Sequence, residues 1–88
     1  MKIYEYEGKK NVTGERIRQA RVVKHLSQEE LAAKMQVRGV VIERASIGRI
    51  ERFDRFVTDY ELMVFADVLG VPVDWLLGNG CTGSIFTE

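Results

Sequence analysis

The residues of this chain best suited to chemistry are arginines spaced along one short segment. In the run Ala-Ser-Ile-Gly-Arg-Ile-Glu, Ile47 and Ile50 recur at helical spacing, which predicts that they share the buried face of a helix. Arg44, Ser46 and Arg49 are then left to face outwards. A guanidinium group is a two-pronged hydrogen-bond donor and suits the O6 and N7 acceptors of guanine. The spacing therefore indicates a helix that could read the edges of DNA bases.

A helix just upstream is predicted to hold this one in place. Ser27 and Glu30 form a capping box, in which the hydroxyl accepts from an early helix amide and the carboxylate reaches back to the amide of the cap. Leu31, Ala32 and Met35 follow as an apolar stripe, and the small Ala32 would let the next helix cross at a steep angle. Two helices docked in this way can offer one edge to the major groove of DNA.

Caps and helix breakers predict the other helices. One helix is expected from about Thr13 to Lys24, with Thr13 as its N-cap. His25 follows it in the left-handed conformation that often ends a helix. A second capping box begins at Thr58 and starts a fourth helix that ends at Gly70. A short fifth helix then closes the core.

The composition fits one small globular domain. The chain has 88 residues, of which 45% are hydrophobic and 30% are charged. We expect an all-α fold with a short extended N-terminal arm over residues 1–12, a five-helix domain over residues 13–78 and a C-terminal tail over residues 79–88. No apolar run is long enough to span a bilayer, and the single cysteine favours a reducing compartment, so a cytoplasmic protein is expected.

The net charge is zero, but the charges are unevenly distributed. Residues 9–58 carry twelve basic and six acidic side chains, an excess of six positive charges. Residues 59–88 carry five acidic side chains and no lysine or arginine. The basic part coincides with the two helices described first, as a surface that faces DNA phosphates requires.

Enzymatic and metal-dependent functions find no support in the sequence. His25 and Cys81 have no other histidine, cysteine or carboxylate residues near them at the spacing of metal ligands, so no metal site is expected. The chain has no nucleophile elbow, phosphate-binding loop or paired-carboxylate motif. We therefore expect no enzyme activity, no cofactor and no small-molecule ligand.

The order of these motifs resembles the phage repressor and Cro-like helix-turn-helix family, the xenobiotic-response-element type. The likeness covers about residues 13–78 and rests on five runs: Gly14-Glu-Arg-Ile17, Leu26-Ser-Gln-Glu-Glu-Leu-Ala32, Ser46-Ile-Gly-Arg-Ile-Glu51, Ala66-Asp-Val-Leu-Gly-Val71 and Asp74-Trp-Leu-Leu77. The resemblance implies a five-helix domain whose third helix enters the major groove. Members of the family usually regulate transcription and often bind a palindromic operator as dimers.

The resemblance also implies roles for individual side chains. Three residues fall on positions that contact base edges: Arg44, Ala45 and Arg49. Four residues are the candidates for phosphate contacts: Gln28, Ser46, Arg52 and Arg55. Arg21 and Glu51 correspond to a partly buried ion pair that ties the first helix to the third. The alternative for the arginines is an ordinary solvated helix face.

One segment departs from the family pattern. The family joins its second and third helices by a tight turn that contains glycine, whereas Gln36 stands at that glycine position here and extra residues follow it. We expect Gly39 to form the new turn and Ile42 to fill the apolar position before the third helix. The longer turn could also add Arg38 as a DNA contact.

Two functions fit these features. The first is a sequence-specific regulator of transcription that binds double-stranded DNA, most simply a repressor of phage or mobile-element type that occupies a promoter. The alternative is a protein-interaction module, or an antitoxin-like partner, that keeps the fold without specific DNA binding.

A homodimer is expected on DNA, because one recognition helix reads too few base pairs to select a site. The candidates for the dimer interface are apolar: Val71, Trp75, Ile85 and Phe86. The alternative is that Trp75 covers the core of its own chain.

Overall fold

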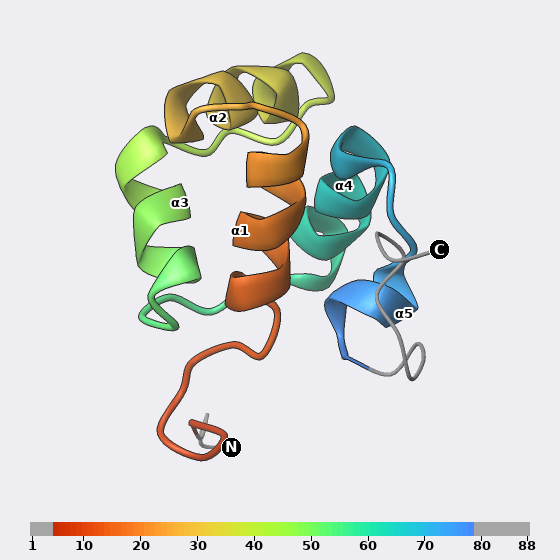
Figure 1. Cartoon of the computed structure of the whole chain (residues 1–88). Helices are drawn as coiled ribbons and strands as arrows, with labels where there is room; N and C mark the ends of the chain where they lie inside the picture. The colour runs from red at the N-terminus through yellow and green to blue at the C-terminus, as the bar shows by residue number, and fades with distance from the viewer. Residues whose placement is uncertain (1–4, 79–88) are drawn as a thin grey trace.

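The computed structural model describes residues 5–78, and its regular structure is helical (Figure 1). The helices are α1 (Gly14–Val23), α2 (Gln28–Val37), α3 (Arg44–Glu51), α4 (Asp59–Leu69) and α5 (Val73–Leu76). The predicted all-α architecture of five helices is therefore confirmed for the described residues. None of these helices is long and apolar enough to cross a membrane.

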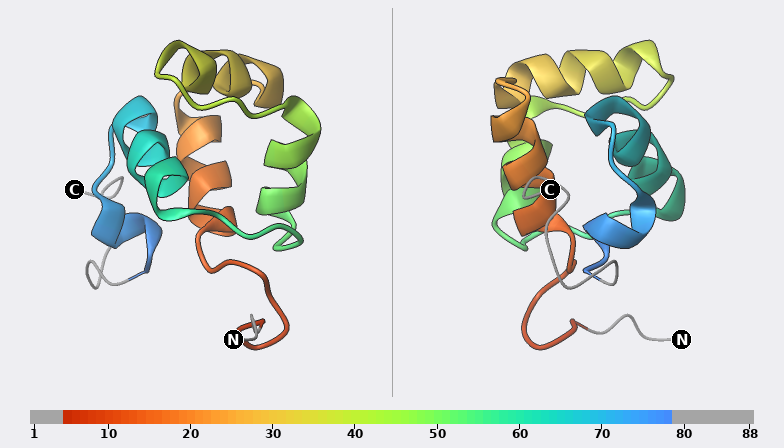
Figure 2. Two further views of the ribbon diagram at one scale, coloured as in Figure 1. Left: turned by 180° about the vertical axis from the view of Figure 1, so that it is seen from behind. Right: turned by 45° about the vertical axis from the view of Figure 1, so that its right-hand side comes forward.

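The helix α1 lies at the centre of the arrangement. It has α3 on one side and α4 on the other, while α2 crosses one end and α5 packs beside α4 (Figures 1 and 2). All five helices contribute fully buried side chains, the largest being Trp75, Phe65, Ile17, Leu31, Met35, Ile47, Ile50, Leu69 and Leu76. Ala32 is also buried, so the stripe predicted on α2 faces this shared core.

Both predicted capping boxes are present. Glu30 N donates to Ser27 Oγ over 2.9 Å, and Ser27 N donates to Glu30 Oε1 over 2.8 Å. At the start of α4, Glu61 N donates to Thr58 Oγ1 over 3.3 Å and Thr58 N donates to Glu61 Oε1 over 3.0 Å. Each box satisfies amides that the first turn of a helix leaves unpaired. As a result, α2 and α4 begin where the sequence predicts.

The helix α1 also begins near its predicted start, but Thr13 does not cap it with its side chain. The backbone of Thr13 is helical, with φ −100° and ψ −11°, whereas a capping residue is usually extended. Its hydroxyl therefore makes no cap hydrogen bond, and Thr13 Oγ1 is buried without a partner. Asn11 takes over the capping role, because its Oδ1 accepts from Gly14 N over 2.8 Å. Thr13 thus stands at the predicted N-cap position, but the prediction that its side chain caps the helix is wrong.

The lengthened turn between α2 and α3 has the predicted features. Gly39 has φ +92°, in the left-handed region that favours glycine. Ile42 is buried, with only 2% of its surface exposed. Gln36 Nε2 donates to Ile42 O over 3.1 Å and ties the end of α2 to this segment. Val40 is buried as well, so the extra residues add to the core. His25, at the end of α1, has the predicted left-handed conformation with φ +59°.

The expectation that Val71 and Trp75 leave apolar surface for a partner is wrong. Val71 is 7% exposed and Trp75 1% exposed, because α5 packs against α1 and α4 and closes the core. Arg16 covers the indole ring, with its guanidinium carbon 4.7 Å from the ring centroid, and its Nη1 donates to Trp75 O over 2.9 Å. The other two interface candidates, Ile85 and Phe86, lie outside the described residues.

The described part of the N-terminal arm, residues 5–12, forms one tight turn before it joins α1. Tyr6 N donates to Lys9 O over 2.7 Å, and Lys9 N donates to Tyr6 O over 2.9 Å. The predicted extended stretch lies partly outside the described residues, and the described part of the arm is a local turn that leaves the helical body below α1 (Figure 1).

Candidate nucleic-acid interface

The helix α3 has one buried face and one exposed face. Ile47 and Ile50 are fully buried in the core, as their spacing predicts. Arg44, Ala45 and Arg49 are exposed. Because both isoleucines are fixed in the core, the orientation of α3 about its axis is fixed as well, and the arginines are held on the outside of the molecule.

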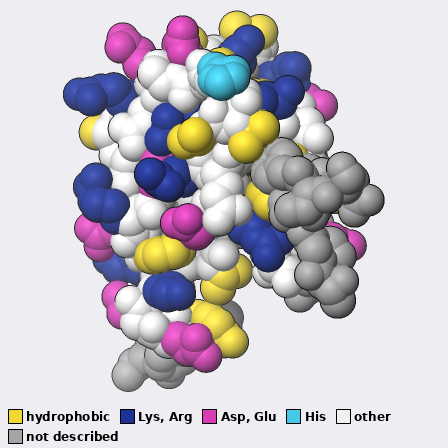
Figure 3. Space-filling view, in the orientation of Figure 1, with side chains coloured by type: hydrophobic (Ala, Val, Ile, Leu, Met, Phe, Trp, Pro, Cys, Tyr) yellow, Lys and Arg dark blue, Asp and Glu magenta, His cyan; other side chains and the backbone are white. Residues whose placement is uncertain are grey.

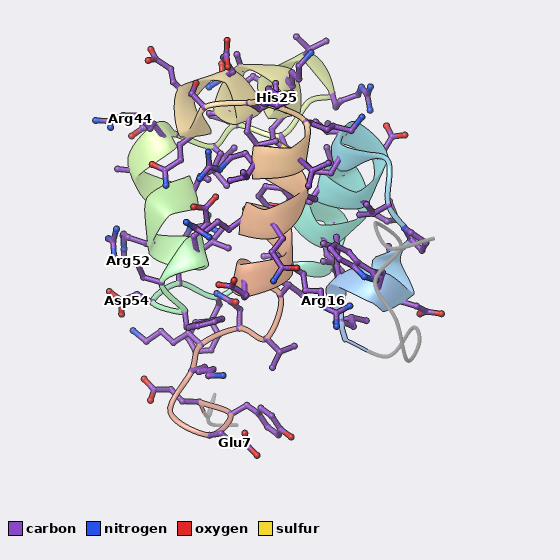
Figure 4. All side chains as sticks on the ribbon, viewed as in Figure 1. Glu7, Arg16, His25, Arg44, Arg52 and Asp54 are labelled. Atoms are coloured by element: carbon purple, nitrogen blue, oxygen red, sulfur yellow. The ribbon has the colours of Figure 1, made fainter. Side chains whose placement is uncertain are left out.

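Arginine side chains extend outwards along the length of α3. Figure 4 shows Arg44 at the start of the helix and Arg52 just after its end, both directed away from the body, and Figure 3 shows dark blue side chains along the same edge. In the described part of the chain, the side chains of Arg44, Arg49 and Arg52 make no ion pair and no hydrogen bond. Ser46, on the same helix, is half-buried. The three guanidinium groups are therefore free to bind anions or base acceptors.

The last turn of α3 is anchored by a buried network. Arg21 Nε donates to Glu51 Oε2 over 2.7 Å, and Arg21 Nη2 donates to Glu51 Oε1 over 3.1 Å. The two side chains are 14% and 5% exposed, so the predicted ion pair between α1 and α3 is present and largely buried. Gln28 Nε2 donates to the same carboxylate over 3.0 Å, and Arg21 Nη1 donates to Leu26 O over 2.8 Å. The network ties both α1 and α2 to α3.

Two of the residues predicted to contact phosphates have protein partners. The side-chain amide of Gln28 is used on Glu51, as described above. Arg55 donates from Nη1 and Nη2 to the two carboxylate oxygens of Glu61, each over 3.1 Å, and from Nη1 to Phe56 O over 3.0 Å. Both side chains therefore have structural roles in the described part of the chain, and the phosphate contacts predicted for Gln28 and Arg55 stay predictions.

The contact with Arg55 also changes the acidity of Glu61. Burial raises the pKa of this carboxyl group. Hydrogen bonds from Arg55 and from the Thr58 backbone, together with the attraction of the guanidinium charge, lower the pKa by more than burial raises it. The net result is a pKa below the ordinary value of 4.5. Glu61 is therefore ionised at neutral pH, and it serves both in the capping box with Thr58 and as the partner of Arg55.

Arg38 does not extend the surface of α3. It is the C-cap of α2 and pairs with Asp67 of α4, at the end of α2 that lies away from α3 (Figure 1). The lengthened turn thus directs this side chain to an acidic residue on another face, and the expected extra DNA contact is corrected to a surface ion pair.

Asn11 is the residue at this site that sequence reasoning missed. It is 9% exposed, and its Nδ2 donates to Ile50 O over 3.0 Å and to Arg55 O over 2.8 Å. The available signal was its position three residues before Gly14, because asparagine is one of the preferred residues at helix starts. Its contacts with the end of α3 had no signal in the sequence.

Neither a protein-family model nor a curated protein matches this sequence. The chain is similar to the DNA-binding domain of BldD from S. venezulae, with 36% identity and a TM-score of 0.63 over 76% of this chain and 93% of that chain. A crystal structure of the DNA-binding domain of BldD matches with 30% identity and a TM-score of 0.65 over 82% and 97% of the two chains. The P22 c2 repressor protein, in complex with a synthetic operator, shares the fold with 23% identity and a TM-score of 0.67 over 80% and 98%.

Proposed function

Because the chain belongs to the phage repressor-like helix-turn-helix family of DNA-binding domains, we propose that it is a sequence-specific regulator that binds double-stranded DNA through α3. The observation that carries the proposal is the exposed face of α3, where Arg44, Arg49 and Arg52 have no partner among the described residues. A helix fixed to its core on one side, with free guanidinium groups on the other, can enter a major groove without rearrangement of the fold.

Two kinds of contact are assigned to this surface. Arg44 and Arg49 donate to base edges, with guanine as the preferred partner, and Ala45 contacts a thymine methyl group. Arg52 and Ser46 contact phosphates and so set the register of the helix on the duplex. This division follows the positions that the family resemblance gives to these residues, and the exposure of the three free guanidinium groups is what allows such contacts.

The proposed mode of regulation is repression by occupancy. A DNA-bound domain that covers a promoter blocks access to it without any catalytic step, so this mode asks nothing of the chain beyond residues 13–78. The alternative, a protein-interaction module without specific DNA binding, predicts that the chain prefers no duplex sequence.

Two copies are proposed to bind one operator, since one recognition helix selects too short a sequence. Trp75 is not part of the proposed interface, because it is buried in its own chain. Sedimentation at micromolar concentration, with and without duplex DNA, tests the proposal. A complex with two chains per duplex is expected, and a strict one-to-one complex would exclude the dimer.

Selection of duplexes from a random library by the purified chain tests specific DNA binding. We expect enrichment of one sequence, arranged as an inverted repeat if two copies bind, and an affinity that falls steeply as salt increases. If no sequence is enriched and no duplex is bound, the protein-interaction alternative is favoured.

A further inference from the structure

Asn11 joins the start of α1 to the end of α3 and the loop that follows it, 39 and 44 residues further along the chain. Its Oδ1 accepts from Gly14 N, at the start of α1, over 2.8 Å. Its Nδ2 donates to Ile50 O, in the last turn of α3, over 3.0 Å, and to Arg55 O, in the loop that follows α3, over 2.8 Å. The side chain is nearly buried, and both donor positions of its amide are used. A satisfied buried amide of this kind fixes the segments that it bridges.

The helices α1 and α3 meet at this point without a side chain between them. A Cβ atom added to Gly14 would lie 2.1 Å from Ile50 O and 3.0 Å from Asn11 Oδ1. The end of α3 therefore rests directly on the start of α1, because only a glycine leaves room for the Ile50 carbonyl. The separation of the two helices here is set by Gly14 and by the hydrogen bonds of Asn11.

The N-terminal arm holds the loop after α3 through two further contacts. Lys10 N donates to Phe53 O over 3.0 Å, and the Lys9 ammonium group lies 4.6 Å from the centroid of the Phe53 ring. Phe53 has φ +64°, in the left-handed region, where a phenylalanine persists only if its surroundings hold it. The arm and the end of α3 thus form one connected unit.

We propose that Asn11 is a positioning residue for DNA recognition, because it sets where the C-terminal end of α3 lies relative to α1. The inference rests on the proposed function and adds a determinant outside the helix-turn-helix. Arg49 immediately precedes Ile50 and Arg52 follows it by two residues, so a shift of the Ile50 carbonyl moves both guanidinium groups. Base contacts require a fixed geometry, whereas attraction to phosphates tolerates displacement. Loss of Asn11 therefore lowers sequence preference more than it lowers binding to DNA in general.

Four variants separate positioning from general stability. Asn11→Asp keeps the acceptor but removes the donor to Ile50 O and Arg55 O, and Asn11→Ala removes both. Thr13→Val is the matched control, because buried Thr13 Oγ1 has no partner and its removal breaks no hydrogen bond. Thr58→Ala weakens the cap of α4 and controls for a loss of stability remote from α3.

Two readouts are needed. The first is the ratio of affinities for the duplex that the wild-type chain selects from a random library and for a scrambled duplex of the same length, at a temperature where every variant is folded. Both Asn11 variants are expected to lower this ratio about tenfold, whereas Thr13→Val and Thr58→Ala keep it. The second readout is the rate of amide hydrogen exchange without DNA. The amides of Arg52, Phe53 and Asp54 donate to carbonyl groups in the last turn of α3. Their exchange is expected to be faster in the two Asn11 variants and unchanged in the two controls.

An unchanged ratio in the Asn11 variants overturns the proposal, whatever their exchange rates. The proposal is also overturned if Thr58→Ala lowers the ratio as much as Asn11→Ala, because lost stability would then explain the effect. If the wild-type chain selects no duplex, the proposed function fails and the proposal falls with it. That outcome is visible before any variant is measured, so the two failures are distinguishable.

Discussion

Glu51 contributes more to the fold than one ion pair. Its carboxylate accepts hydrogen bonds from Arg21 of α1 and Gln28 of α2, and the residue is 8% exposed. We expect Glu51→Ala to lower the free energy of unfolding by about 3–5 kcal/mol, because it leaves the Arg21 guanidinium largely buried without its acceptor. Urea unfolding measures the change, with exposed Glu29→Ala as the control. Equal midpoints for Glu51→Ala and wild type would show that the pair contributes nothing.

The ion pair of Arg55 and Glu61 predicts how stability depends on pH. Because the pKa of Glu61 is lowered in the folded chain, its charge stabilises the fold above the ordinary pKa of 4.5, and this contribution is lost as the pH falls through the folded pKa. Glu61→Gln, which keeps a capping-box residue, is therefore expected to be less stable than wild type near neutral pH, and the difference is expected to narrow in acid. Denaturant unfolding at about pH 7 and about pH 3 measures it. A difference that is constant with pH would rule out the role given to the charge.

At the scale of the helices, alanine variants of two glycines test how closely α1 and α3 pack, with Gly48 as the control for Gly14. A Cβ on Gly14 would clash with Ile50 O at 2.1 Å, whereas a Cβ on Gly48 would make ordinary contacts, 3.4 Å from Arg52 Nη1 and 3.6 Å from Gln28 Oε1. Gly14→Ala is expected to destabilise the fold by about 1–3 kcal/mol. Gly48→Ala is expected to stabilise it by about 0.5–1 kcal/mol, since alanine is the better helix former. Thermal melting compares the two variants, and a Gly14→Ala variant as stable as wild type would contradict the close approach of the helices.

Local signals were sufficient to predict most of the elements. The capping boxes at Ser27 and Thr58 and the turn at Gly39 depend on residues a few positions away, and the structure confirms all three. The cap of α1 is the local exception. Asn11 and Thr13 are both good capping residues, and the sequence alone does not decide between them, because the choice depends on the contact of Asn11 with α3.

The partners of long polar side chains could not be predicted in the same way. Gln28 reaches Glu51, which is 23 residues away, and Arg38 pairs with Asp67, which is 29 residues away. These contacts depend on the angles at which helices pack, and spacing along the chain does not give those angles. Trp75 is a similar case, because an apolar residue near the end of a domain can cover either its own core or a partner.

Across the whole molecule, positive charge is concentrated in residues 9–58. Two arginines near α3 are expected to use this charge differently, Arg52 for DNA binding and Arg55 for the stability of the fold. Arg52 is exposed and free, so Arg52→Ala is expected to weaken binding to every duplex and to reduce the slope of log affinity against log salt by about 1. Arg55 is held by Glu61, so Arg55→Ala is expected to lower stability and to leave the slope unchanged. Titrations at several salt concentrations measure both slopes. An equal reduction of the salt slope in the two variants would show that Arg55 also contacts a phosphate.

The double variant with Arg44→Ala and Arg49→Ala tests most directly whether α3 reads the DNA bases. Each guanine contact by an arginine contributes about 1–3 kcal/mol of discrimination between sequences. Because both side chains are exposed, the variant is expected to keep the wild-type melting temperature. Its affinity for the duplex selected by the wild-type chain is expected to fall to that for a scrambled duplex. A folded double variant that still prefers the selected duplex as strongly as wild type would show that α3 does not read the bases.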